Sequence, residues 1–464
     1  MDRRPLREEC GVFGVFGADK AAANVLAGLS ALQHRGQEGC GVATLESTGR
    51  ISVRKGLGLV SQVFPTDAYR DHPGRFAVGH VRYGTSGGGE LDNVQPFVFH
   101  RGTHDFAVVH NGNIVNTEEL KIRLEKMGSL FRSSSDSEIL GHLVHGLSTG
   151  KEGLTARSLK RALNLIDGAF SFLVLTPDRL YACRDKYGFR PLSIGRLGDG
   201  YAVGSETCAL HAVGVDVLRD VLPGEVVEIG PEGISSSFFA AGHRNTLCAM
   251  EYIYFARPDS DIEGVNVHSY RVESGRILFQ ESPADADMVF GVPDSGISGA
   301  IGYARASGLP LETGLIKNFY VGRTFIQPNQ RLRMAGVRMK LTPVPSVVKG
   351  RRVVVIDDSI VRGTTSRQIV HMLREAGAAE IHMRITSAPL RHPCYYGVDI
   401  STESELISAR MDVGEVCRYI GADSLAFLSE SGMLEAGRRT ELCMACFNDD
   451  YPTALYSHGG EKEP

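Results

Sequence analysis

A short stretch from Arg351 to Ala378 constrains the fold of this chain more than any other part of the sequence. It reads RRVVVIDDSIVRGTTSRQIVHMLREAGA, so a run of β-branched residues leads into two aspartates, a Gly/Thr loop and a helical pattern that Gly377 would end. An apolar run without polar alternation is typical of a strand that a parallel sheet buries on both faces. Ligands bind outside the carboxyl ends of such strands, so the stretch predicts a site at Asp357 and Asp358.

The loop after the two aspartates has the composition of a phosphate-binding site. Small hydroxyl residues stand where the helix begins, and the N–H groups of a helix start lack partners and carry partial positive charge. The paired carboxylates beside it could hold Mg²⁺ or accept hydrogen bonds from ribose hydroxyls. The alternative is a capped helix that follows a strand with two exposed acids. The loop residues concerned are Arg362, Gly363, Thr364, Thr365 and Ser366.

The segment just before this strand is strongly basic. Residues 313–356 contain no Asp or Glu, and residues 317–336 within them show no clear period, which predicts a mobile loop able to close over a polyanion. A solvated basic face is the common alternative. We favour the loop because the segment leads directly into the aspartate-bearing strand. Its positive residues are Lys317, Arg323, Arg331, Arg333, Arg338, Lys340, Lys349, Arg351 and Arg352.

The sequence pattern changes near residues 235–250, which divides the 464 residues into two large parts. Residues 10–240 consist mostly of short β-runs with a few helices, for example at 136–147, where Asp136 could cap. This mixture predicts stacked sheets with helices outside them, an α+β or layered architecture. After residue 250, strands and helices alternate, which predicts a parallel α/β sheet. We place the boundary between residues 240 and 241.

Composition excludes several classes of protein. The net charge of −4 argues against a dedicated nucleic-acid binder, and no apolar run is long enough to span a membrane. The N-terminus has no apolar core typical of a secretory signal. Nine cysteines, an odd number, fit a reducing cytoplasm better than a disulfide framework. We therefore expect a cytoplasmic α/β protein that binds neither nucleic acid nor membranes.

The second half resembles a known family. The string VVVIDDSIVRGTT is similar to the signature of type I phosphoribosyltransferases, and VPDSG is similar to their pyrophosphate loop. Together with EYIYFARPDS (251–260) and NFYVGRTFI (318–326), these strings resemble the amidophosphoribosyltransferase family over nearly the whole chain. The resemblance implies that Asp357 and Asp358 contact ribose and Mg²⁺ and that Ser295 helps at the metal. It also implies that residues 362–366 hold the 5-phosphate, while Lys317, Arg323 and the mobile loop cover pyrophosphate.

Cys10 is a candidate nucleophile because it precedes the first convincing strand, GVFGVFG. If residues 1–9 were removed as a propeptide, Cys10 would carry both a thiol and a free α-amine. An α-amine titrates near 8 and a thiol at about 8.5, so the amine could serve as the base of the thiol. The alternative is a buried structural cysteine at a strand start, which is the commoner role of a cysteine.

Three more strings support the nucleophile. QHRGQEGCG (33–41), HVRYGTSG (80–87) and HNGNI (110–114) resemble class II glutamine amidotransferases of the N-terminal nucleophile hydrolase type, which have a layered αββα fold. By this resemblance Cys10 attacks the amide of glutamine. The other implied roles are oxyanion stabilisation by Asn111 and Gly112, carboxylate binding by Arg82 and amine binding by Asp136. Cys40 departs from the family pattern, where a smaller residue is usual, and places an extra oxidisable thiol near the site.

Four further cysteines suggest a metal centre whose kind the spacing leaves open. Cys443 and Cys446 form a CxxC, which structural zinc, an iron–sulfur cluster or chance could each produce. The resemblance favours one [4Fe–4S] cluster held by Cys248, Cys394, Cys443 and Cys446, as in the cluster-bearing branch of the family. We expect that cluster to be structural. Cys183, Cys208 and Cys417 are better interpreted as core residues.

The two resemblances together imply one reaction. Glutamine and phosphoribosyl pyrophosphate would give 5-phosphoribosylamine, glutamate and pyrophosphate, the first committed step of de novo purine synthesis. They also imply purine nucleotides as feedback inhibitors and a homotetramer. Two alternatives agree less well with the sequence. A sugar-phosphate aminating transaminase would lack IDDSIVRGTTS, which this chain has, and a nucleotide-sensing regulator would not need Cys10, Arg82, Asn111 and Asp136 together.

Overall fold

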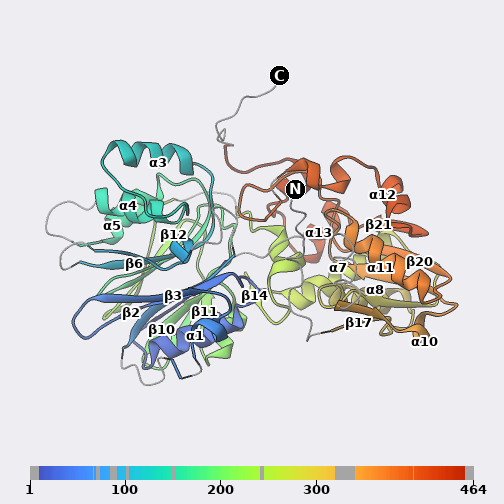
Figure 1. Cartoon of the computed structure of the whole chain (residues 1–464), viewed down its shortest axis with the longest axis horizontal. Helices are drawn as coiled ribbons and strands as arrows, with labels where there is room; N and C mark the ends of the chain where they lie inside the picture. Colours follow the sequence, from blue (N-terminus) through green and yellow to red (C-terminus); the bar gives the residue numbers. More distant parts are fainter. Residues whose placement is uncertain are drawn as a thin grey trace.

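The computed structural model describes residues 10–65, 67–68, 74–83, 91–100, 104–147, 153–240, 245–318, 340–400 and 402–454. They form two lobes side by side, one built from the N-terminal half and one from the C-terminal half (Figure 1). The expected propeptide, residues 1–9, and Arg323 with most of the basic loop lie outside the described residues.

The first lobe contains two stacked sheets. Within the described residues, one sheet has seven strands in the order β11-β9-β10-β1-β4-β2-β3, and all its neighbours are antiparallel. Its strands are β1 (Gly11–Phe16), β2 (Gly39–Leu45), β3 (Ile51–Leu57), β4 (Phe76–Arg82), β9 (Ser193–Leu197), β10 (Gly200–Gly204) and β11 (Asp216–Asp220).

The second sheet has the described order β13-β12-β8-β7-β6-β5 and is also antiparallel. Val12, Val109 and Leu173 are fully buried between the two sheets because alternate residues of each strand face the other sheet. The strands are β5 (Phe97–Phe99), β6 (Phe106–Ile114), β7 (Gly168–Leu175), β8 (Leu180–Arg184), β12 (Glu225–Gly230) and β13 (Gly233–Phe238).

Helices cover the outer face of each sheet. α1 packs on the first sheet, and α3, α4 and α5 pack on the second (Figure 1). The predicted layered αββα architecture is therefore confirmed. The helices of this lobe are α1 (Ala21–Ala31), α2 (Val60–Val63), α3 (Thr117–Lys126), α4 (Glu138–Leu147), α5 (Ala156–Leu163) and α6 (Thr207–Ala212).

The second lobe is built on a parallel sheet, as predicted. Its described strands follow the order β16-β19-β20-β21 and are β16 (Met288–Gly291), β19 (Arg352–Asp357), β20 (Glu380–Ile385) and β21 (Ser424–Phe427). The helices that accompany the sheet are α7 (Val267–Glu281), α8 (Gly296–Ser307), α11 (Thr364–Glu375), α12 (Val413–Ile420) and α13 (Glu430–Ala436). Short helices also belong to this lobe: α10 (Pro345–Val348), α14 (Ala445–Asn448) and the 3-10 helices η3 (Glu403–Glu405) and η4 (Ile407–Ala409). Two short antiparallel strand pairs complete it: β14 (Asp261–Ile262) with β15 (Val265–Asn266), and β17 (Leu315–Lys317) with β18 (Leu341–Pro343).

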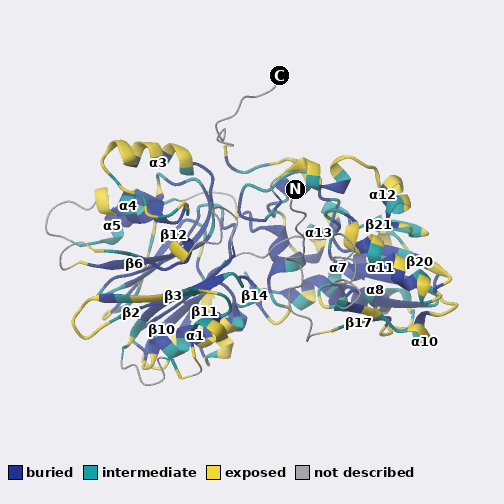
Figure 2. Ribbon diagram, viewed as in Figure 1, coloured by how far each residue is buried: buried dark blue, intermediate teal, exposed yellow. Residues whose placement is uncertain are grey.

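The stretch from Arg351 to Ala378 folds as its pattern predicts. Val353 to Ile356 are fully buried in β19, which has a parallel neighbour on each side. Elsewhere the surface helices have exposed faces, as α3 does (Figure 2). After β19 the chain turns at Gly363, where φ is +71°, and α11 begins at Thr364. Gly377, with φ of +93°, follows the end of α11. The carboxyl end of β19 thus presents Asp357 and Asp358 beside a helix N-terminus.

Candidate functional site

Cys10 lies at the start of β1 and lines a small cavity in the first lobe. Its thiol is 3.5 Å from the carbonyl oxygen of Tyr83 and 3.4 Å from the backbone nitrogen of the same residue. The cavity collects four of the five residues predicted for the glutamine site, Cys10, Arg82, Gly112 and Asp136, and is also lined by Tyr83, Asn93, Gln95, His110, Ser135 and Ser137. Arg82 reaches it from the end of β4.

Asn111 and Gly112 lie on β6 and fit an oxyanion-binding role. The Asn111 side chain is fully buried, and neither its oxygen nor its nitrogen has a hydrogen-bond partner among the described residues. A buried amide without a partner is unfavourable unless a ligand satisfies it. Gly112 has φ of +144°, and a Cβ there would lie 2.0 Å from the carbonyl oxygen of Ala169. Only glycine can therefore occupy this turn of the strand.

Asp136 faces β6 rather than capping α4, so the expected cap is corrected. One oxygen of its carboxylate accepts a hydrogen bond from the backbone N–H of Ile114 at 2.9 Å, and the other accepts from the Ser137 hydroxyl at 3.2 Å. The Ser137 hydroxyl is also 2.8 Å from Nδ1 of His110. Burial lowers the pKa of His110, which keeps the ring neutral beside the site.

Residues outside the predicted set hold this arrangement together. The Gln95 side chain accepts from the His110 N–H at 2.6 Å and donates to the Ser137 hydroxyl at 3.0 Å. Nε of Arg35 donates to the carbonyl oxygen of Cys10 at 3.1 Å. Arg35 and His110 lie in two of the strings that resemble class II amidotransferases. Their position within those strings is the sequence feature that could have identified them as site residues.

Cys40 differs from the expectation of an oxidisable thiol near the site. It is fully buried in β2, between Gly56 of β3 and Val81 of β4. Burial raises the pKa of its thiol to about 12. Thiolate is the reactive form of cysteine, so this thiol is protected from oxidation.

A second group of predicted residues meets in the other lobe, at the carboxyl end of β19. Asp357 and Asp358 are buried there, and the Ser295 hydroxyl donates to Asp358 at 2.5 Å. Burial and the neighbouring Asp358 raise the pKa of Asp357 well above its ordinary value. Two adjacent buried carboxylates are the donor set that a divalent cation satisfies, since Mg²⁺ in proteins often binds one or two carboxylates together with substrate phosphates.

The predicted phosphate loop lies at the N-terminus of α11. A Cβ on Gly363 would be 2.8 Å from the tip of the Ile407 side chain, and it is mainly the positive φ of Gly363 that favours glycine at this turn. Ser366 is buried, Thr364 and Thr365 open the helix, and Arg362 forms an ion pair with Glu405 at 2.8 Å. Backbone N–H groups at a helix start are suited to bind an anion, which is the role predicted for this loop.

Lys317 stands at the edge of the same site. It ends β17 and forms an ion pair with Asp294, which belongs to the VPDSG loop ahead of α8. The contact places the base of the basic segment beside the loop predicted to bind pyrophosphate. Arg323, predicted from the same segment, is not among the described residues.

Both lobes match known families. A family model described as "Glutamine amidotransferase domain" matches residues 89–212, and one described as "Phosphoribosyl transferase domain" matches residues 277–412. The chain is 51% identical to the Bacillus subtilis (strain 168) protein named "Amidophosphoribosyltransferase", with 97% of this chain and 95% of that protein covered. The chain belongs to the amidophosphoribosyltransferase family. A protein of the same name from Synechococcus elongatus is 46% identical, with 97% and 93% covered.

Solved structures of amidophosphoribosyltransferases agree with this assignment. One, described as glutamine phosphoribosylpyrophosphate (PRPP) amidotransferase from B. subtilis complexed with ADP and GMP, superposes with a TM-score of 0.90 at 50% identity, covering 97% of this chain and 98% of that one. Another, described as the structure of the allosteric regulatory enzyme of purine biosynthesis, has a TM-score of 0.91. The reaction of the family is the glutamine-dependent amidation of phosphoribosyl pyrophosphate, the first committed step of de novo purine synthesis.

The four cysteines predicted to bind a cluster come from three segments that converge between the lobes. Cys248 pairs with Cys443 as an isolated parallel bridge, and the Ala249 N–H donates to the Cys443 carbonyl at 3.1 Å. Burial, Cys394 and Cys443 raise the pKa of Cys446, so these thiols lie within electrostatic reach of one another. Across the described residues, however, no three His, Cys, Asp or Glu side chains are grouped closely enough to hold a metal ion.

The three cysteines predicted to be core residues differ in burial. Cys183 and Cys208 are buried, and Cys417 is partly buried beside the Ala422 carbonyl. Each of the helices that the structure describes is too short or too polar to cross a lipid bilayer.

Proposed function

We propose that the chain divides the amidophosphoribosyltransferase reaction between its two groups of residues. Glutamine is hydrolysed at Cys10, and the ammonia released displaces pyrophosphate from phosphoribosyl pyrophosphate at Asp357 and Asp358. The observation that carries the first assignment is the fully buried Asn111 amide, unpartnered among the described residues and next to Gly112 on the Cys10 cavity.

At the first group, the Cys10 thiolate attacks the side-chain carbonyl carbon of glutamine, and the C=O electron pair moves to the oxygen. The Asn111 amide and the Gly112 N–H donate to this oxyanion, and each such donor is typically worth about 3 kcal/mol. Collapse of the intermediate releases ammonia, and water then hydrolyses the thioester to glutamate. Arg82 pairs with the α-carboxylate of glutamine, and Asp136 pairs with its α-amine.

The base in this step is the α-amine of Cys10, which requires that residues 1–9 form a removed propeptide. The glutaminase domain then spans residues 10–240 and the phosphoribosyltransferase domain residues 241–464. We expect the intact mass of active protein to correspond to a chain that begins at Cys10. Active protein that retains residues 1–9 would contradict this assignment.

At the second group, Asp357, Asp358 and Ser295 would hold Mg²⁺, which would supply positive charge to pyrophosphate when bound. The helix start at residues 362–366 binds the 5-phosphate through its N–H groups. Lys317 and Arg323 provide positive charge for pyrophosphate. The protein contributes mainly by positioning C1 of the sugar for attack by ammonia.

The reaction is tested by incubating the protein with glutamine, phosphoribosyl pyrophosphate and Mg²⁺. We expect glutamate and pyrophosphate to appear in equal amounts, because each transferred nitrogen comes from one glutamine. Replacing glutamine with ammonium salt at alkaline pH removes glutamate formation but leaves pyrophosphate release. Glutamate without pyrophosphate under all conditions would contradict the second assignment.

We propose a [4Fe–4S] cluster on Cys248, Cys394, Cys443 and Cys446, because four cysteine thiolates are the ligands of such clusters. The proposal rests on residue type, since no three of these side chains are grouped closely enough in the described structure to hold a metal ion. None of the four is in a disulfide, and three are buried. The cluster would tie the C-terminal segment to the region before α7. We expect anaerobically purified protein to contain about four iron and four sulfide per chain. Protein that is folded and active without iron would contradict the proposal.

A relative supports a proposal about nucleotide partners. The B. subtilis structure is described as a complex with ADP and GMP, and we propose that purine nucleotides inhibit this enzyme and that it is cytoplasmic. We further propose a homotetramer. Nucleotide titration of the initial rate and the molar mass in solution test these two proposals separately.

A further inference from the structure

Four charged side chains form a fully buried cluster where the two lobes meet. Arg35, Arg190, Glu206 and Glu251 are each at most 1% exposed. Arg35 makes a two-pronged ion pair with Glu251, at 2.7 and 2.9 Å, and a third contact with Glu206 at 2.8 Å. Arg190 adds a contact with Glu251 at 3.3 Å. Two guanidinium groups thus share two carboxylates in a site without water exposure.

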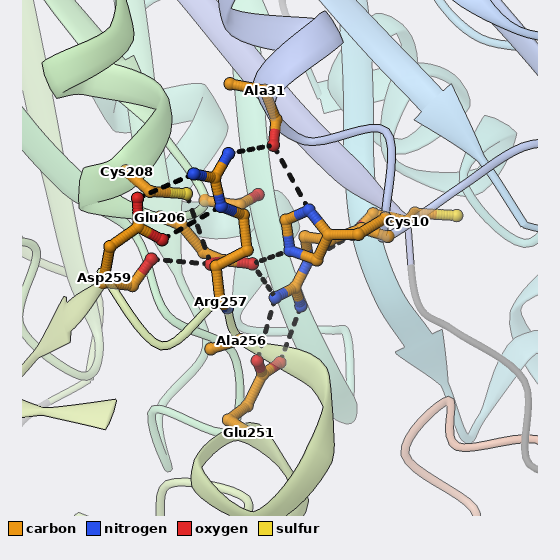
Figure 3. A network of polar contacts seen from close by, with 12 residues as sticks. Cys10, Ala31, Glu206, Cys208, Glu251, Ala256, Arg257 and Asp259 are labelled. Carbon is orange, nitrogen blue, oxygen red and sulfur yellow. Dashed lines mark hydrogen bonds and ion pairs between the residues drawn. The ribbon is translucent and has the colours of Figure 1, made fainter. Parts of the chain in front are cut away.

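This cluster reaches the residue that bears the nucleophile. The guanidinium that binds Glu251 is joined to it by dashed lines in Figure 3. It belongs to Arg35, which also donates through its Nε to the Cys10 carbonyl at 3.1 Å. Arg35 follows α1 in the first lobe. Glu251 comes from the other side of the predicted domain boundary, in the π-helical turn η2 (Glu251–Phe255), which packs on α7. The second lobe therefore supplies a side chain to the support of Cys10.

Glu251 is held firmly by the core of the second lobe. Arg271 on α7 is buried and donates to the carbonyls of Tyr252 at 2.7 Å and Ala256 at 2.9 Å, which fixes the π-helical turn at both ends. α7 in turn packs closely on α8, since a Cβ on Gly275 would lie 1.9 Å from the Gly299 carbonyl oxygen. α8 begins directly after Ser295. π-Helical turns frequently occur at functional sites.

Loss of the Glu251 charge would displace Arg35 rather than leave it in place. The carboxylate partner that Arg35 would keep is Glu206 (Figure 3). Glu206 also contacts the His34 ring at 2.7 Å and the Ser260 hydroxyl at 2.7 Å. The guanidinium would move toward Glu206, and its bond to the Cys10 carbonyl would weaken. Once residues 1–9 are removed, Cys10 is the first residue and has a covalent neighbour on one side only. Contacts to its carbonyl therefore restrict its position more than they would in the middle of a strand.

We propose that Glu251 is a positioning residue for the nucleophile: through Arg35 it fixes the carbonyl of Cys10, so that attack on glutamine requires the second lobe to be docked. This inference rests on the proposed role of Cys10. It predicts a selective defect, because Glu251 contacts neither the aspartate pair nor the phosphate loop in the described structure.

The test compares two rates in the full-length Glu251→Gln enzyme, which keeps the side-chain shape and removes the charge. We expect glutamine-driven synthesis and alkylation of Cys10 by a diazoketone analogue of glutamine to fall about ten- to a hundredfold, as is typical when a reacting group shifts by about 1 Å. Ammonia-driven synthesis should stay within about twofold, because it does not use the thiol. The ratio of the two synthetic rates is therefore the decisive quantity.

Glu263→Gln provides the matched control. Glu263 is a partly buried acid of the second lobe that binds an arginine of the first, Arg184 at 2.7 Å, and it binds Arg439 at 2.6 Å as well. It touches neither Arg35 nor Cys10 in the described structure, so its loss weakens lobe contacts without moving the nucleophile. We expect the rate ratio of Glu263→Gln to equal that of the parent.

The outcomes separate this inference from the function it rests on. An unchanged rate ratio in Glu251→Gln, or an equal fall in Glu263→Gln, would overturn the role of Glu251 alone. Glutamine-driven synthesis by Cys10→Ala would overturn the role of Cys10 and this inference with it. If Glu251→Gln does not fold, Glu251→Asp decides, because it keeps the charge but shortens the reach by one methylene. The same fall in ratio supports the role, and an unchanged ratio overturns it.

Discussion

Cys10→Ala is expected to abolish synthesis of 5-phosphoribosylamine from glutamine, by about a thousandfold or more, and to leave synthesis from ammonia within about twofold of the parent rate. Alanine removes the thiol that forms the covalent intermediate, and the oxyanion donors alone cannot replace a nucleophile. The second site receives ammonia in either case, because Cys10 lies in the first lobe and Asp357 and Asp358 lie at the carboxyl end of β19 in the second. Initial rates of pyrophosphate release with each nitrogen source measure the effect.

Cys40→Ala is the matched control for this substitution. Cys40 lies on β2, which pairs with β4 next to the site, but it is fully buried and its pKa is raised to about 12. Its loss leaves a small cavity in the core, so we expect lower stability and unchanged rates with both nitrogen sources. If Cys10→Ala also lost ammonia-driven synthesis, or if Cys40→Ala matched it, the division of labour between the two sites would be refuted.

The parts of the sites that could be predicted lie in short strings whose chemistry depends on immediate neighbours. Asp357 and Asp358 follow a buried strand and precede a helix start, so strand, carboxylates and phosphate loop were all evident within residues 351–378. Asn111 and Gly112 likewise share one strand, and the turn needs glycine because of its positive φ. Both layered architectures followed from the same kind of local pattern.

The contacts that escaped prediction join residues far apart in the chain. Glu251 is 216 residues from Arg35, and neither spacing nor periodicity can pair them. The carboxylate of Asp136 was expected at a helix start two residues away, but it bonds to the N–H of Ile114, 22 residues back on β6. A tertiary N–H donor competes equally well for such a carboxylate. Charged pairs buried between lobes are therefore the part of a site that local sequence leaves undetermined.

Asp358→Asn is expected to lower synthesis at least a hundredfold with both nitrogen sources, which distinguishes it from Cys10→Ala. The amide keeps the shape of the side chain but removes a charge that, with Asp357, makes the carboxyl end of β19 suitable for Mg²⁺ and ribose. It also places an N–H₂ group against one of the two hydroxyls, Ser295 at 2.5 Å and Ser359 at 2.7 Å, that donate to Asp358. Alkylation of Cys10 by the diazoketone analogue, measured without phosphoribosyl pyrophosphate, should keep its parent rate.

The control for Asp358→Asn belongs at the other end of the same strand. Asp287 accepts from the Arg352 N–H at 2.9 Å, and its second oxygen pairs with the Arg352 side chain at 3.0 Å, where β19 begins. Asp287→Asn therefore removes a carboxylate from the same sheet at the edge opposite to the proposed site, and its rates should remain near those of the parent. Equal losses in Asp287→Asn and Asp358→Asn would indicate that the sheet itself had been disturbed. A normal ammonia-driven rate in Asp358→Asn would show that the carboxyl end of β19 is not where pyrophosphate is displaced, because a reaction centred there cannot lose a metal-binding charge without slowing.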